Sequence, residues 1–154
     1  IIYHLGQIMK KIFIFITFLM LSNCSSYVFN EEKVECPNLT SPIGSEQLIV
    51  KLSDNRKAYL GFRGVNSKCF SNGKNIKMLL QVNIRAIIKN FKKDDKIPIF
   101  LTLVSINKNK KEFDRDKLDY NFFLRENRKI VEFKTNMSVV VPEKGEALIG
   151  MKKR

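Results

Sequence analysis

The residues of this 154-residue chain whose types could do chemistry are three cysteines, one histidine and a group of carboxylates near residue 115. The carboxylates are Glu112, Asp114, Asp116 and Asp119. Oxygens at alternating positions could coordinate Ca²⁺, but the glycine and the distal bidentate glutamate of an EF-hand loop are missing, and basic residues interleave. Asp114 and Asp116 could also form the acid pair of a glycosidase, yet nothing in the sequence shapes a sugar cleft around them. We therefore predict a salt-bridged surface loop here and no metal site.

The sequence contains no set of residues with a recognisable catalytic pattern. His4 is the only histidine, and it precedes the part of the chain that we expect to remain after processing, so no nucleophile has a histidine base. A Gly-x-Ser-x-Gly motif is missing, and Gly61 and Gly64 lack the following helix that a phosphate-binding loop needs. We predict a protein that is not an enzyme and holds no cofactor.

An apolar run of ten residues near the amino terminus predicts export. Residues 12–21 contain one polar residue, Thr17, and follow Lys10 and Lys11. A ten-residue helix rises about 15 Å, half the roughly 30 Å of a bilayer's hydrocarbon core, so the run is too short for a permanent anchor. A basic flank before a short apolar core is typical of a signal peptide. We expect the signal peptide to span 9–23, and we interpret 1–8 as sequence upstream of the true start.

The four residues Leu21, Ser22, Asn23 and Cys24 follow the apolar core directly. They resemble the lipobox of bacterial lipoproteins, although Asn23 departs from the Gly, Ala or Ser that is usual there. The resemblance implies that Cys24 is acylated, that cleavage occurs just before it, and that the acyl chains hold the protein in a membrane. Ser25 in place of Asp implies the periplasmic face of the outer membrane rather than the inner membrane. In the alternative interpretation, Cys24 is an ordinary cysteine after a conventional signal peptide or in a membrane-anchored stub.

The other two cysteines, Cys36 and Cys69, form an even pair in an oxidising compartment. A disulfide between them would close a loop of about 34 residues and stabilise the fold by about 3.5–4 kcal/mol on the chain-entropy model. Reactive thiols lack support, because no CxxC spacing or neighbouring histidine would lower a thiol pKa. We predict a structural disulfide, with two buried free thiols as the alternative.

The mature chain divides into a polar, proline-containing tether over 24–44 and a β-rich domain over 45–154. Residues 76–91 alternate between apolar and polar side chains, which is the period of a strand rather than of a helix. Further short β-type runs alternate with turn signals; they cover 47–52, 58–65, 97–106, 111–114, 118–124, 128–135, 137–141 and 146–152. We predict one all-β domain, an antiparallel immunoglobulin-like or fibronectin-like sandwich of about seven or eight strands.

Three aromatic residues, Tyr120, Phe122 and Phe123, lie in one of these runs. Consecutive residues of a strand point to opposite sides, so one phenylalanine could be an exposed binding anchor. We expect instead that both are buried, one between the sheets and one under a loop.

A wider resemblance rests on Cys36-Pro37 and Cys69, on 97–104, and on Val140-Val141-Pro142 with 145–150. These segments are similar to a group of small alphaproteobacterial lipoproteins of unassigned function. The resemblance implies a sandwich domain anchored in the envelope and supplies no reaction.

The net charge of +13 arises from 28 Lys and Arg residues against 15 Asp and Glu. Lysine outnumbers arginine by 21 to 7 and is scattered along the chain. A nucleic-acid surface would ordinarily add bidentate arginine contacts or aromatic residues interleaved with basic ones, so nucleic acid is a poor candidate. We predict a non-enzymatic envelope lipoprotein that binds lipid through Cys24 and another envelope protein through its domain, by strand addition at a sheet edge. The alternative is a secreted or periplasmic basic protein that binds polyanions such as nucleic acid or lipopolysaccharide.

Overall fold

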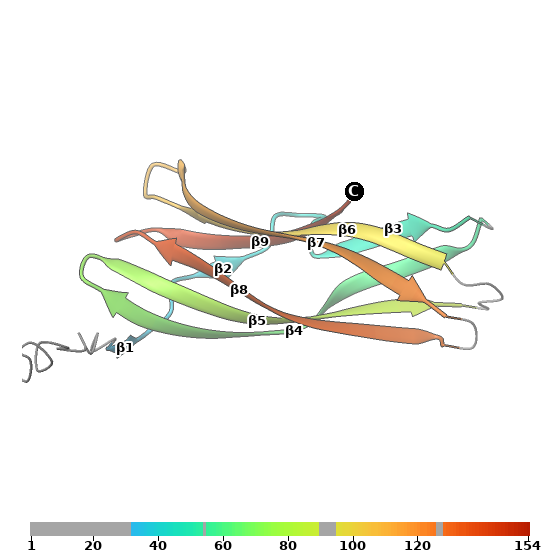
Figure 1. Ribbon diagram of the computed structural model, residues 1–154. Coiled ribbons are helices and arrows are strands. Elements are labelled where there is room, and N and C mark those ends of the chain that lie inside the picture. The colour runs from blue at the N-terminus through green and yellow to red at the C-terminus, as the bar shows by residue number, and fades with distance from the viewer. Residues whose placement is uncertain (1–31, 54, 90–94, 126–127) are drawn as a thin grey trace, which may run out of the picture. The chain divides into compact units, whose positions relative to one another are not determined.

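The computed structural model describes residues 32–53, 55–89, 95–125 and 128–154. The predicted upstream residues 1–8, the predicted signal peptide over 9–23 and Cys24 lie outside the described residues. Within the described part the chain forms nine strands and no helix (Figure 1). The strands are β1 (Lys33–Val34), β2 (Leu39–Thr40), β3 (Gln47–Lys51), β4 (Lys57–Asn72), β5 (Asn75–Ile88), β6 (Asp95–Ile106), β7 (Glu112–Leu124), β8 (Ile130–Val141) and β9 (Glu146–Lys153).

The strands form two sheets that pack face to face. Sheet A has the order β1-β4-β5-β8, and β3 also pairs with β4; sheet B has the order β2-β9-β6-β7. Figure 1 shows β4 and β5 in the lower layer and β6 and β9 in the upper layer. Every pairing is antiparallel except that of β2 with β9, which is parallel. The prediction of an all-β sandwich is confirmed, and its immunoglobulin-like or fibronectin-like subtype stays a prediction.

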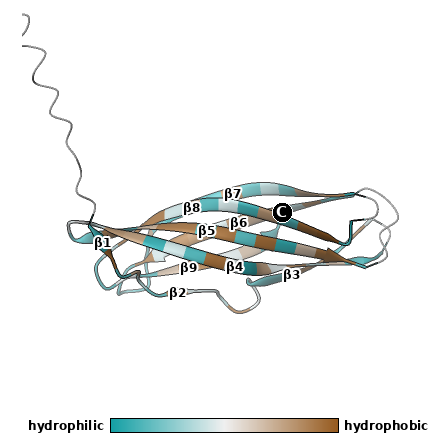
Figure 2. Ribbon diagram, turned by 90° about the horizontal axis from the view of Figure 1, so that it is seen from below, coloured by the Kyte–Doolittle hydropathy of each residue, from teal (hydrophilic) through white to brown (hydrophobic). Residues whose placement is uncertain are grey.

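The core lies between the two sheets and follows from the alternation in the sequence. Apolar side chains at every second position of β5 and β6 are fully buried; they include Met78, Leu80, Val82, Ile84, Ile97, Ile99, Leu101 and Leu103. Figure 2, which views the molecule from below, shows hydrophilic and hydrophobic residues alternating along β4 and β5. Burying each such side chain contributes about 1.5–3 kcal/mol, which is the main force that holds the two sheets together.

Several strands are longer than the sequence predicts. β4 continues to Asn72, where the predicted strand ended at residue 65, because β5 pairs with it along its length, with a β-bulge between Phe62 and Gly64. The runs predicted separately at 111–114 and 118–124 form the single strand β7, and those at 128–135 and 137–141 form β8. A long neighbour satisfies the backbone groups of polar residues, so pairing overrides the local turn preference.

Residues 32–44, which the sequence analysis assigned to the tether, belong to the same compact unit as the sheets. β1 pairs with β4 and β2 with β9. Beyond β2, Ser41 donates a hydrogen bond from Oγ to the Ile149 carbonyl at 2.5 Å, and the Met151 N–H donates to the Ser45 carbonyl at 2.7 Å. The segment therefore covers the edge of β9.

Candidate interaction surface

Cys36 and Cys69 are joined by a disulfide, with 5.2 Å between their Cα atoms. Cys69 is buried on β4, and Cys36 lies in the segment between β1 and β2. The bond thus ties the segment between β1 and β2 to a central strand of sheet A. It agrees with the predicted pair and leaves no role for two free thiols.

The carboxylates Glu112, Asp114, Asp116 and Asp119 lie on strand β7, so the predicted loop is wrong, although two of the carboxylates form ion pairs as expected. Glu112 pairs with Arg115 at 2.5 Å, and Asp119 pairs with Arg154 at 2.7 Å. The hydrogen bond from Arg115 holds the pKa of the Glu112 carboxyl below its ordinary value. Both pairs lie at the surface, where such pairs stabilise a fold only weakly.

Asp114 and Asp116 instead accept hydrogen bonds from backbone N–H groups of β8, a contact that was not predicted from the sequence. The Val140 N–H donates to Asp114 Oδ2 at 2.7 Å, and the Ser138 N–H donates to Asp116 Oδ2 at 2.9 Å. β7 is the edge of sheet B and β8 is the edge of sheet A, so the two carboxylates bridge the sheets. Within the described ranges, no group of three or more His, Cys, Asp or Glu residues could hold a metal ion.

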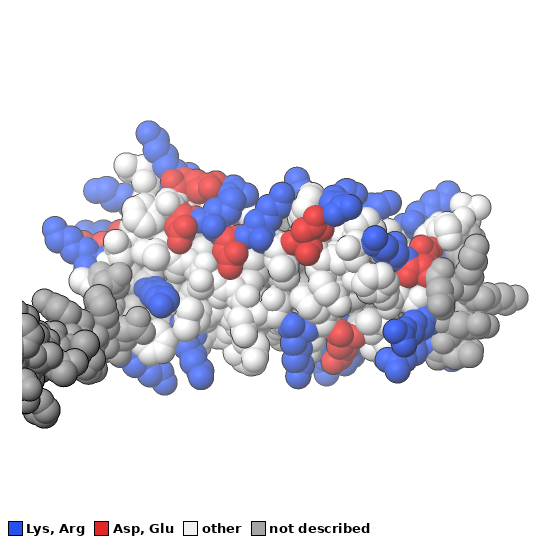
Figure 3. All heavy atoms as spheres, in the orientation of Figure 1, with Lys and Arg blue, Asp and Glu red and all other residues white. Residues whose placement is uncertain are grey.

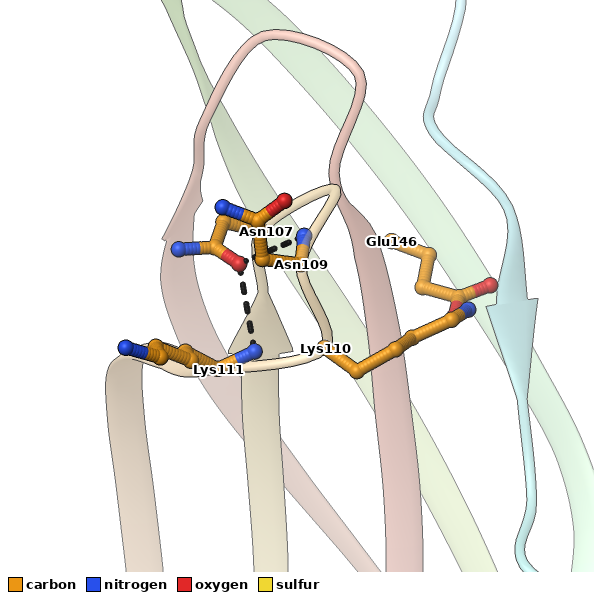
Figure 4. Close-up of polar contacts among 5 residues, drawn as sticks. All are labelled: Asn107, Asn109, Lys110, Lys111 and Glu146. Atoms are coloured by element: carbon orange, nitrogen blue, oxygen red, sulfur yellow. Dashed lines mark hydrogen bonds and ion pairs between the residues drawn. The ribbon is translucent and has the colours of Figure 1, made fainter.

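The hairpin between β6 and β7 carries the basic residues of 108–111. Asn107 Oδ1 accepts hydrogen bonds from the N–H of Asn109 at 2.9 Å and from that of Lys111 at 3.1 Å (Figure 4). Lys110 adopts a positive φ of 60° and pairs with Glu146 on β9. An asparagine that bonds its own turn is a common hairpin device. These lysines are therefore part of an internally bonded turn.

Strand β9 of sheet B and strand β8 of sheet A offer little room for an added strand. The segment that includes β2 covers β9, and the carboxylates of β7 occupy the N–H groups of Ser138 and Val140 on β8. An incoming strand would have to displace these bonds. The expected mode of strand addition is therefore blocked at these positions, and the faces of the sheets become the better candidates.

The outer face of sheet A carries a row of exposed apolar side chains that crosses four strands. The register places Ile49 of β3 beside Tyr59 of β4, Tyr59 beside Ile87 of β5, and Ile87 beside Ile130 of β8. Their exposed fractions are 66%, 43%, 40% and 51% respectively. Single exposed apolar residues are ordinary, but neighbouring ones mark interaction sites. We call these four residues the apolar row.

Basic side chains flank the apolar row on the same face. Lys51 and Lys57 lie two residues from Ile49 and Tyr59 on their strands, and residues two apart on a strand share a face. Lys89 follows the end of β5, two residues after Ile87. Figure 3 shows mainly basic side chains along the lower edge, where Figure 1 has β4 on the left and β8 on the right. This flank gives the apolar row a positive border.

A shallow groove of about 310 Å³ adjoins the other side of the apolar row. Gly61 leaves its floor open, and Glu46, Arg63 and Arg85 contribute charged side chains. Arg85 pairs with Glu132 at 2.6 Å, and this hydrogen-bonded contact lowers the pKa of the Glu132 carboxyl. On this side Arg63 and Arg85 are balanced by Glu46 and Glu132, so the net positive charge beside the apolar row lies with Lys51, Lys57 and Lys89.

A second groove of about 450 Å³ lies over the outer face of sheet B, lined by Val104, Leu148 and Gly150. Its charged border differs from that of the apolar row. Arg115 pairs with Glu112 there, and Lys110 pairs with Glu146. Because these charges neutralise one another within the domain, this groove exerts less attraction on a charged partner than the apolar row does.

The aromatic residues of β7 divide between the core and the surface. Phe122 is fully buried, and Tyr120 stacks on Phe133 of β8 with ring centroids 3.6 Å apart. Phe123 has 63% of its surface exposed, so the expectation that both phenylalanines are buried is wrong for Phe123. The strand places it on the outer face of sheet B, where no loop of the described chain covers it.

The apolar row was not among the features predicted from the sequence, although the sequence carries a signal for it. Each of its residues directly precedes an apolar residue of the opposite, inward face: Val50, Leu60, Ile88 and Val131. Such apolar doublets break the strict alternation of a half-buried strand. Their alignment into one row depends on strand register, which a single sequence does not reveal.

Comparison with protein-family models, with curated proteins and with solved structures finds no match for this chain. Across the residues that the structure describes, no helix has the length and apolar character needed to cross a membrane.

Proposed function

We propose that the chain is a non-enzymatic lipoprotein of the bacterial envelope, anchored through an acylated Cys24, with its sandwich domain acting as an interaction module in the periplasm. The periplasmic face of the outer membrane is the favoured location. The observation that carries the interaction role is the apolar row, since neighbouring exposed apolar side chains are characteristic of interaction sites.

The anchoring part of the proposal rests on the sequence between Leu21 and Cys24 and on the short apolar core before it. The Cys36–Cys69 disulfide supports it, because disulfides form and persist in exported proteins and are rare in the cytosol. The length of chain between Cys24 and β1 would supply the tether that a lipid-anchored domain needs.

Labelling with radioactive palmitate in a bacterial host tests the proposal. We expect label in the wild-type protein and none in Cys24→Ala, because Cys24 is the predicted acyl acceptor. The matched control is the double variant Cys36→Ala/Cys69→Ala, which removes the other two cysteines and should keep the label. An unlabelled wild-type protein of unchanged size would overturn the proposal.

The second candidate function is binding of a polyanion such as nucleic acid or lipopolysaccharide, and the basic flank of the apolar row favours it. Such binding would depend on counterion release, so its affinity should fall steeply as salt rises. An affinity that stays flat between low and moderate salt would eliminate this candidate.

A further inference from the structure

We propose that the outer face of sheet A lies on an anionic lipid surface, with the apolar row at the boundary between headgroups and acyl chains. The inference rests on the proposed function and names what the interaction module contacts, namely the membrane that holds the acylated Cys24.

The chemistry of this face matches a negatively charged bilayer. Three aliphatic side chains and one tyrosine form the apolar row, and Lys51, Lys57 and Lys89 border it. Surface-bound amphipathic elements combine apolar side chains that enter the headgroup region with lysine or arginine that attracts anionic lipid. The tyrosine suits the interface, because its ring is apolar and its hydroxyl is polar.

The shape of the face also suits a bilayer rather than a small ligand. Neighbouring strands lie about 4.8 Å apart, so a row across four of them spans about 14 Å. All four side chains project from the outer face of sheet A, where the register makes them neighbours across β3, β4, β5 and β8.

The position of the tether makes this contact reachable. Nine residue steps separate Cys24 from Lys33, and an extended chain of that length reaches no more than about 30 Å. Lys33 pairs with Phe70 on β4, so the described chain begins at the edge of sheet A itself. Phe70 lies eleven residues from Tyr59, about 36 Å along the strand. A domain lying on sheet A would bring the tether and the apolar row to one membrane.

A second copy of the chain is a poorer occupant. Two copies stacked through this face with their strands running in the same direction would bring Lys51, Lys57 and Lys89 of one copy near the same residues of the other. Facing like charges oppose association. An anionic bilayer offers the opposite charge to the same residues.

The chain contains no tryptophan, so a single introduced tryptophan reports its own surroundings. The test places it on the apolar row with Tyr59→Trp and, as a control, on sheet B with Phe113→Trp. The two sites have similar exposed fractions, 43% for Tyr59 and 48% for Phe113. Each full-length protein, purified from host membranes, is reconstituted into vesicles whose acyl chains carry bromine, which quenches tryptophan at short range.

We expect loss of Tyr59→Trp emission in vesicles that contain phosphatidylglycerol, and little loss in vesicles of phosphatidylcholine alone or at high salt. Phe113→Trp should keep its emission in both kinds of vesicle. Adding Ile49→Ser and Ile130→Ser to Tyr59→Trp should restore the emission, whereas adding Ile43→Ser, at a fully exposed site outside the apolar row, should not.

Unquenched Tyr59→Trp in phosphatidylglycerol vesicles would overturn the inference, as would equal quenching in both lipids or equal quenching of Phe113→Trp. Crosslinking that joins two copies, or a copy and another protein, through the apolar row would also overturn it. The palmitate experiment separates the two proposals. A labelled protein with an unquenched Tyr59→Trp removes only this inference, and an unlabelled wild-type protein removes the anchoring on which it rests.

Discussion

Asp114 on β7 accepts a 2.7 Å hydrogen bond from the backbone N–H of Val140 on β8, although the two strands belong to different sheets. Asp116 repeats the contact with the N–H of Ser138. Edge strands expose unpaired backbone groups that invite association with other chains, and many proteins block them with charged side chains. Here the edge strand of one sheet supplies the carboxylates that block the edge strand of the other.

The first prediction concerns this contact. Asp114→Ala should destabilise the domain by about 1–2 kcal/mol, because the partly buried Val140 N–H loses its acceptor. Asp114→Asn keeps an acceptor oxygen and should cost less. Urea unfolding measures both. Asp119→Ala, which removes only an exposed ion pair with Arg154, is the control and should cost no more than about 1 kcal/mol. Equal losses for Asp114→Ala and Asp119→Ala would contradict a special role for the bridge.

The second prediction concerns the Cys36–Cys69 disulfide. Reduction should lower the free energy of unfolding by about 3.5–4 kcal/mol, because the reduced unfolded chain regains the entropy of a loop with a sequence separation of 33. Thermal unfolding with and without reductant gives the difference. The double variant Cys36→Ala/Cys69→Ala should unfold at the same temperature with or without reductant. A wild-type protein insensitive to reductant would refute the prediction.

The third prediction compares two neighbouring phenylalanines. Phe122→Ala should destabilise the domain by about 3–5 kcal/mol, because it leaves a cavity between the sheets. Phe123→Ala should change stability by no more than about 0.5 kcal/mol, since that ring is mostly exposed. Chemical denaturation of the two variants in parallel provides the measurement. Similar losses for both would mean that Phe123 is covered in the folded protein.

The fourth prediction concerns two glycines with different surroundings. A Cβ atom on Gly145 would lie 2.6 Å from the Ile106 carbonyl oxygen and 2.8 Å from that of Pro142, so Gly145→Ala forces the backbone to move. We expect a loss of about 1–3 kcal/mol in thermal or urea unfolding. Gly64→Ala is the control, because nothing lies within 4 Å of its Cβ position. Its effect should stay within about 0.5 kcal/mol, and a larger loss for Gly64→Ala than for Gly145→Ala would refute the steric explanation.

Sequence reasoning recovered the fold class because burial imposes a period of two on half-buried strands. The alternation through Met78, Leu80 and Val82 identifies β5 without any structure. The same reasoning ended β4 too early and split β7 and β8, because polar residues such as Asn66 resemble a turn when the paired strand is unknown. In β4, the backbone hydrogen bonds to β5 decide where the strand ends, and the local amino-acid composition does not reveal these bonds.

The apolar row could be predicted from the sequence only in part. The apolar doublets at Ile49-Val50 and Ile87-Ile88 are visible in the sequence, but their members belong to strands far apart in the chain. Only the register of sheet A aligns them. In the same way, nothing near Asp114 in the sequence indicates that its partner is the N–H of Val140, 26 residues later.

The sequence by itself supplied what depends on neighbouring residues: the prediction of an export signal, the resemblance to a lipobox at Cys24, the β-type alternation and the even pair Cys36 and Cys69. The tertiary structure decided which strands pair, where the edges of the two sheets meet and which apolar side chains remain outside. The physical reason is that alternation assigns a side chain to one face of its own strand. Whether that face is covered, and which side chains share it, depends on pairing between residues distant in the chain.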